Sequence, residues 1–206
     1  MTALPSPAPC AFEWAVASTA IDGESGDLHC VLPGSECSIV GAIDGLGHGP
    51  EAAVAARECA AIVRAHSGAE LDELVRRCHD GLRGTRGVAL TLGRIDTRKE
   101  LLSWVAIGNV EGLVLRRGLV RGPTLDAVLQ RGGVVGYRLP GIKVSDVALE
   151  PNDLIVFATD GIKSGFATTI HLGLGVQELA DQICSRFARG SDDALALVVR
   201  YLGGVP

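Results

Sequence analysis

The sequence is poor in aromatic residues and has neither a basic run nor a long apolar run. Only 4% of its 206 residues are Phe, Trp or Tyr, although 47% are hydrophobic, so the core must be mainly aliphatic. Its 19 Lys and Arg against 24 Asp and Glu leave a formal net charge of −5. Without a Lys/Arg cluster, general binding to nucleic acid or anionic membranes is excluded. No apolar run reaches the length of a membrane span.

The amino-terminal segment 1–10 has no basic residue and no long apolar stretch. We therefore interpret it as a loose lead-in rich in Pro, Ala and Ser, not as a signal peptide, and expect a cytoplasmic protein. A chain of this length suits one medium-sized core, so we expect residues 11–206 to form a single domain.

The cysteines form no CxxC pair and no zinc-ligand spacing with histidine. In a chain that is not secreted, we expect them to be reduced, buried small hydrophobic residues. They are Cys10, Cys30, Cys37, Cys59, Cys78 and Cys184.

Strand-like and helix-like patterns follow one another along the chain. Apolar or alternating stretches predict strands at residues 12–19, 28–32, 37–43, 87–95, 100–108, 112–117, 132–135, 143–149, 153–158 and 194–202. Helical spacing predicts helices that begin near Pro50, at Leu71 and at Leu174. The three strands between residues 87 and 117 have the pattern of a meander. The order predicts an α+β protein in which helices cover mainly antiparallel sheets.

The most informative segment reads Asp44-Gly45-Leu46-Gly47-His48-Gly49, and it joins an apolar strand to an alanine-rich helix. The glycines allow a sharp turn and a close approach to the backbone. A carboxylate at a strand end, beside exposed carbonyl groups, is a natural ligand for a hard cation. Taken alone, the segment is better explained as an ordinary glycine-rich turn whose aspartate is solvated.

Further aspartates stand in turns directly beside apolar strands: Asp27, Asp160 and the pair Asp192-Asp193. If these strand ends converge with Asp44, the acids cannot all stay ionised without a cation. Ligation by oxygen alone suits Mg²⁺ or Mn²⁺ better than zinc. Two such cations, roughly 3.5–4 Å apart, would neutralise a phosphate group and lower the pKa of a water molecule from 15.7 toward about 7. The pattern therefore predicts in-line attack on phosphorus.

Four motifs carry a resemblance to a known family. Ser25-Gly26-Asp27, Asp44 to Gly49, Thr159-Asp160-Gly161-Ile162 and Asp192-Asp193-Ala194-Leu195 resemble, in order and spacing, those of the metal-dependent serine/threonine phosphatases (PPM family), SpoIIE branch. Residues 104–112 and 133–137 are similar to the small stressosome phosphatases of that branch. The resemblance covers residues 12 to 202. It implies two antiparallel β-sheets sandwiched between helical layers, with the metals at one end.

The resemblance also implies roles for individual residues. Asp44 would bridge two Mn²⁺ or Mg²⁺ ions, and the carbonyl group of Gly45 would bind one of them. Asp27 would hold the second metal, and Asp160 would hold the first together with an acid of the last motif.

For that last ligand we favour Asp192, with Asp193 as the alternative, because adjacent acids on a strand edge point to opposite faces. Ala194 departs from the family pattern, which usually has a hydroxyl residue after the acid pair. This departure affects the side chains that would hold the metal ligands in place, not the metal ligands themselves.

Two other polar residues have alternative interpretations. His48 is either a general acid for the leaving serine oxygen or a residue that caps and orients the turn; we slightly favour the second role. Asn109 follows Gly108 at a strand end, and we expect it to be a turn residue in the left-handed conformation rather than a substrate contact.

The resemblance implies a protein serine/threonine phosphatase that acts on phosphorylated STAS-domain proteins of the stressosome, without nucleic-acid or membrane partners. Two alternatives stay open. One is a regulatory binding module with the same fold and no turnover. The other is a two-metal phosphoesterase for small molecules.

Overall fold

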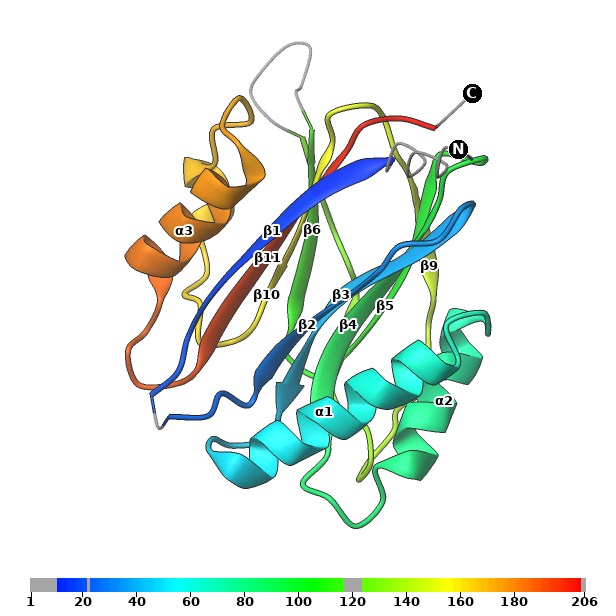
Figure 1. Cartoon of the computed structure of the whole chain (residues 1–206), viewed down its shortest axis with the longest axis vertical. Coiled ribbons are helices and arrows are strands. Elements are labelled where there is room, and N and C mark those ends of the chain that lie inside the picture. Colours follow the sequence, from blue (N-terminus) through cyan, green and yellow to red (C-terminus); the bar gives the residue numbers. More distant parts are fainter. Residues whose placement is uncertain (1–10, 22, 117–123, 205–206) are drawn as a thin grey trace, which may run out of the picture.

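The computed structural model describes residues 11–21, 23–116 and 124–204, so the expected lead-in 1–10 lies outside the described residues. Two β-sheets pack face to face, and helices cover both outer faces (Figure 1). The fold is thus the α+β sandwich that the resemblance implied. Within the described ranges, no helix combines the length and the apolar character needed to span a membrane.

The first sheet has five strands in the order β1-β11-β10-β6-β7, all paired antiparallel. Their bounds are β1 Phe12–Thr19, β11 Ala194–Tyr201, β10 Leu154–Ala158, β6 Glu111–Arg116 and β7 Thr124–Ala127. Helix α3 (Val176–Phe187) packs on β1 and β11 and covers the outer face, together with the short 3₁₀ segment η1 (Phe166–Thr169).

The second sheet has the order β2-β3-β4-β5-β8, and β9 also pairs with β5. The bounds are β2 Asp27–Leu32, β3 Cys37–Gly45, β4 Val88–Asp96, β5 Leu101–Ile107, β8 Gln130–Arg131 and β9 Ser145–Ala148. Among the described strands, β5 and β8 form the single parallel pair. Helices α1 (Pro50–Ala65) and α2 (Leu71–Gly81) cover the outer face.

Successive side chains of a strand point to opposite faces of its sheet, so the buried side chains form three layers. One layer lies between the two sheets, one under α1 and α2, and one under α3. In β11, Leu195 and Leu197 face the other sheet, whereas Ala196 and Val198 face α3. The layer under α1 and α2 is filled by the apolar face of each helix. In α1 that face is made mainly of small residues. Because these residues are small, α1 lies close to β2 and β3, which carry two of the acids.

The predicted meander is wrong in its third strand. Strands β4 and β5 form a hairpin, but β6 leaves this sheet and pairs with β10 and β7 in the other one. The chain crosses at Gly108, whose φ of 94° is in the left-handed region. Because β6 is apolar on both faces, its pattern did not reveal which sheet it joins.

Three other segments differ from the prediction. Residues 132–135 form no strand; Val134 and Val135 make isolated bridges to Arg138 and Val88. The short strands β7 and β8 were not predicted, because β8 spans only two polar residues and β7 is brief. Residue 117, the expected end of a strand, lies outside the described ranges.

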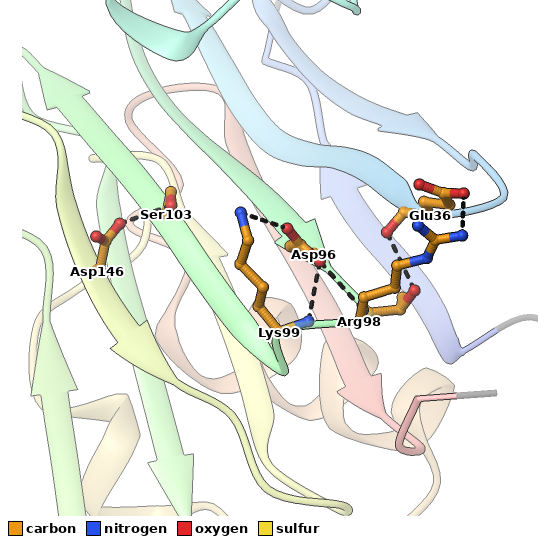
Figure 2. A network of polar contacts seen from close by, with 7 residues as sticks. Glu36, Asp96, Arg98, Lys99, Ser103 and Asp146 are labelled. Carbon is orange, nitrogen blue, oxygen red and sulfur yellow. Dashed lines mark hydrogen bonds and ion pairs between the residues drawn. The ribbon is translucent and has the colours of Figure 1, made fainter. Parts of the chain in front are cut away.

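Figure 2 shows the turn between β4 and β5. The strand register places it at the end of the second sheet away from Asp44. The carboxylate of Asp96 accepts hydrogen bonds from the backbone N–H groups of Arg98 and Lys99, at 3.1 and 3.0 Å. Arg98 forms an ion pair with Glu36 in the neighbouring turn. These contacts hold the turn at residues 96–99 between β4 and β5.

Most of the described cysteines are buried and free, as predicted, but Cys37 is exposed. It is the first residue of β3, at the same end as Asp96, where the sheet is open to solvent. Burial raises the pKa of Cys30 and Cys184 to about 11, so these thiols stay protonated.

Candidate functional site

The predicted acids lie at one end of the sandwich. Asp27, the first residue of β2, is directly opposite Asp44 of β3 in the antiparallel register. Asp160 follows β10, and Asp192 precedes β11. Because these strands are antiparallel neighbours, both acids lie at the same end of the strands in the first sheet. The hydroxyl group of Thr159 donates a hydrogen bond of 2.6 Å to Oδ2 of Asp27. The acidic ends of the two sheets therefore meet.

Burial and mutual repulsion raise the pKa of these acids. Asp27 is only 7% exposed, and its burial raises its pKa to about 7. The pKa of Asp44 is raised to about 8, first by burial and then by the charges of the surrounding aspartates. Burial and the nearby Asp192 raise the pKa of Asp160, although the guanidinium of Arg189 opposes this rise. Like charges held this close favour a bound cation.

Three of the acids line a pocket of about 380 Å³. Asp44 contributes from the second sheet, and Asp160 and Asp192 contribute from the first. Asn109 and Gly47 also line this pocket. Leu46 lies at its edge with 52% of its surface exposed. The pocket therefore opens between the two sheets, with carboxylates on both sides.

The donor set fits a hard cation by its chemistry. Within the described residues, the Asp44 carboxylate takes part in no hydrogen bond or ion pair. Its oxygens are therefore available to coordinate a cation. However, no group of three or more His, Cys, Asp or Glu in the described ranges stands in an arrangement that could hold a metal ion. The carboxylates would have to move closer together to share one.

Gly45 has no room for a side chain. A Cβ atom there would lie 2.2 Å from the carbonyl oxygen of Ala52 in the first turns of α1. The N–H group of Gly45 donates a hydrogen bond of 3.0 Å to the carbonyl oxygen of Gly26. The glycine next to Asp44 thus lets α1 pack directly on the end of β3 and joins it to the residue before Asp27.

The two acids of the last motif have different surroundings. The carboxylate of Asp193 is 3% exposed and accepts hydrogen bonds from the N–H groups of Ile21 (3.0 Å) and Gly26 (2.7 Å). Asp192 lines the pocket, and its Oδ1 accepts the N–H of Asp193. Asp192 therefore faces the pocket, whereas both carboxylate oxygens of Asp193 accept backbone N–H groups.

Asn109 does not have the predicted left-handed conformation; Gly108 has it instead. The amide of Asn109 donates a hydrogen bond of 2.6 Å to Oδ2 of Asp160, so it belongs to the site. The sequence signal that could have found it is an amide residue directly after a glycine at the end of an apolar strand. His48 is exposed and is not among the residues that line the pocket.

Residues 35–202 match the family model described as Stage II sporulation protein E (SpoIIE). The chain belongs to the SpoIIE family. The match includes Asp44, Asp160 and Asp192, and it begins after Asp27. No curated protein is significantly similar to the chain in sequence.

Solved structures share the SpoIIE-family fold. A structure described as "The bacterial stressosome: a modular system that has been adapted to control secondary messenger signaling" is 29% identical, covers 92% of this chain and 99% of its own, and has a TM-score of 0.82. RsbX in complex with magnesium is 18% identical over 92% of this chain and 94% of its own, with a TM-score of 0.78.

The catalytic domain of the serine/threonine protein phosphatase PstP, in complex with two manganese ions, also has this fold. It is 18% identical over 93% of this chain and 98% of its own, with a TM-score of 0.69. The α+β sandwich of this SpoIIE-family chain is thus the PP2C-type phosphatase fold.

Proposed function

We propose that this SpoIIE-family protein is a Mn²⁺- or Mg²⁺-dependent protein serine/threonine phosphatase. The observation that carries the proposal is the meeting of Asp27, Asp44, Asp160 and Asp192 from both sheets at the end of the sandwich, three of them around one pocket. Solved proteins of this fold contain magnesium or manganese, which supports a divalent cation here.

In this proposal Asp44 would be a ligand of both cations, and the carbonyl group of Gly45 would be a ligand of one of them. Asp27 would hold the second cation, whereas Asp160 and Asp192 would hold the first. The bound cations would supply charge to neutralise the phosphate and to acidify a water molecule.

Other side chains orient these donors and handle the leaving group. Asn109 holds one oxygen of Asp160, which leaves the other oxygen for the pocket. Arg189 donates from Nε to the backbone carbonyl oxygen of Asp160 at 2.8 Å, so a positive charge lies beside the acids. His48, on the loop after Asp44, is exposed and does not line the pocket, so we favour a role in orienting this loop, with proton donation to the serine or threonine oxygen as the alternative.

We propose phosphorylated STAS-domain proteins of a stressosome as the substrates. The likeness to RsbX and to a structure described under the bacterial stressosome supports this choice.

The test measures hydrolysis of a phosphorylated STAS-domain protein and of p-nitrophenyl phosphate, each with Mn²⁺ and with a chelator. We expect turnover of both substrates with Mn²⁺, faster turnover of the phosphoprotein, and none with the chelator. Full activity in the chelator would contradict the metal mechanism. Hydrolysis of the small ester alone would favour a small-molecule phosphoesterase, and absence of any turnover would favour a regulatory binding module.

A further inference from the structure

Thr159 connects the two sheets through its hydroxyl group. It follows β10, is 1% exposed, and accepts a hydrogen bond of 2.9 Å from the backbone N–H of Leu195 in β11. Its own proton goes to Oδ2 of Asp27 at 2.6 Å, since the other acceptor, the Leu195 carbonyl oxygen, is 3.4 Å away. The hydroxyl group is therefore oriented by the first sheet and donates to an acid of the second.

Asp193 makes a second connection from the first sheet to the segment that leads into Asp27. One carboxylate oxygen accepts the N–H of Ile21 and the other accepts the N–H of Gly26, the residue directly before Asp27. The β1–β2 loop is thereby attached to the start of β11, and Figure 1 shows the two segments side by side. Thr159 holds the side chain of Asp27, and Asp193 holds the backbone that leads into it.

We propose that Thr159 is a positioning residue that orients Asp27 for cation binding; the proposal rests on the proposed metal-dependent function. A carboxylate with one oxygen held in a buried hydrogen bond cannot rotate freely, so its other oxygen keeps one direction. Asp44, by contrast, receives no hydrogen bond within the described residues. The site thus combines an oriented acid, Asp27, with one that adjusts when a cation binds. Partners that orient a ligand usually contribute strongly to metal affinity.

The test compares Mn²⁺ affinity, measured by calorimetry on the full chain well below its melting temperature, for three variants. Thr159→Val removes the donor and keeps the shape of the side chain, whereas Thr159→Ser keeps the hydroxyl group. Ser38→Ala is the matched control, because Ser38 is 2% exposed and its hydroxyl also accepts a backbone N–H, that of Gly34 at 3.1 Å. Ser38 lies at the opposite end of β3 from Asp44.

We expect Thr159→Val to bind Mn²⁺ about 10–100-fold more weakly. Thr159→Ser should restore the affinity, and Ser38→Ala should leave it unchanged. If Thr159→Val does not fold, Thr159→Cys, which offers only a weak S–H donor, should show the same loss.

Unchanged affinity in Thr159→Val or Thr159→Cys would overturn the positioning role while leaving the phosphatase proposal intact. An equal loss in Ser38→Ala would also overturn it, because the effect would then reflect general destabilisation. If the unaltered protein neither binds Mn²⁺ nor hydrolyses phosphoprotein, the proposed function itself fails.

Discussion

The side-chain nitrogen of Asn109 lies 2.6 Å from Oδ2 of Asp160 and donates a hydrogen bond to it. The bond joins the segment where the chain crosses from β5 to β6 with the segment that follows β10. A Cβ atom on the neighbouring Gly108 would lie 2.4 Å from Cβ of Ala89, so the crossing is tight. The close packing of Gly108 on Ala89 places the side-chain amide of Asn109 within hydrogen-bond distance of Asp160.

Replacing Asn109 with Ala should weaken Mn²⁺ binding by about 10–100-fold, because Asp160 loses the partner that orients it. The matched control is Gln177→Ala, which removes an amide-to-carboxylate hydrogen bond of 3.0 Å to Asp181 on the exposed surface of α3. Calorimetric titration with Mn²⁺ measures both. Equal affinities of Asn109→Ala and the unaltered protein would show that the hydrogen bond has no part in metal binding.

Asp44→Asn should lower kcat/KM by more than about 100-fold, because loss of a group that merely orients a ligand already costs about 10–100-fold. In the presence of a chelator, the same variant should be more stable than the unaltered protein by roughly 0.5–2 kcal/mol, since folding no longer buries a carboxyl group whose pKa it raises to about 8. Phosphatase assays and thermal unfolding with and without Mn²⁺ check the two effects. Undiminished turnover would remove Asp44 from the mechanism.

Gly45→Ala should destabilise the protein by roughly 1–3 kcal/mol, because the new methyl group overlaps the backbone of α1. Gly68→Ala is the control, since a Cβ atom at residue 68 meets nothing within 4 Å. Urea unfolding of both variants gives the comparison. A Gly45→Ala variant as stable as Gly68→Ala would mean that α1 does not pack on Gly45 as described.

Thiol labelling of the folded protein at mildly alkaline pH should modify Cys37 rapidly. Cys30 and Cys184 should react only after unfolding, because burial hides them and raises their pKa to about 11, so little thiolate forms. A Cys10→Ser background removes the thiol outside the described residues. Mass spectrometry locates the label, and rapid labelling of Cys30 or Cys184 would contradict the buried positions of β2 and α3.

The sequence predicted most elements to within a few residues, because their periodicity is strong. Helix α2, for example, shows buried Leu74, Val75 and Cys78 at helical spacing. It did not predict that β6 joins the other sheet, since a strand buried on both faces has no preferred partner in its own pattern. Segments of two to four residues such as β7 and β8 carry too little pattern to be recognised.

The acids could be proposed as a site from the sequence because each stands beside an apolar strand within a motif of the SpoIIE branch. Their nearness, and the different surroundings of Asp192 and Asp193, come from the fold. Thr159 and Asp27 are 132 positions apart, and Asp193 and Gly26 are 167 apart. The spacing of apolar residues along a strand or helix indicates which face of that element each residue occupies. Which distant hydroxyl group, amide or N–H meets a carboxylate depends on how the two sheets pack, because hydrogen bonds require contact within about 3 Å.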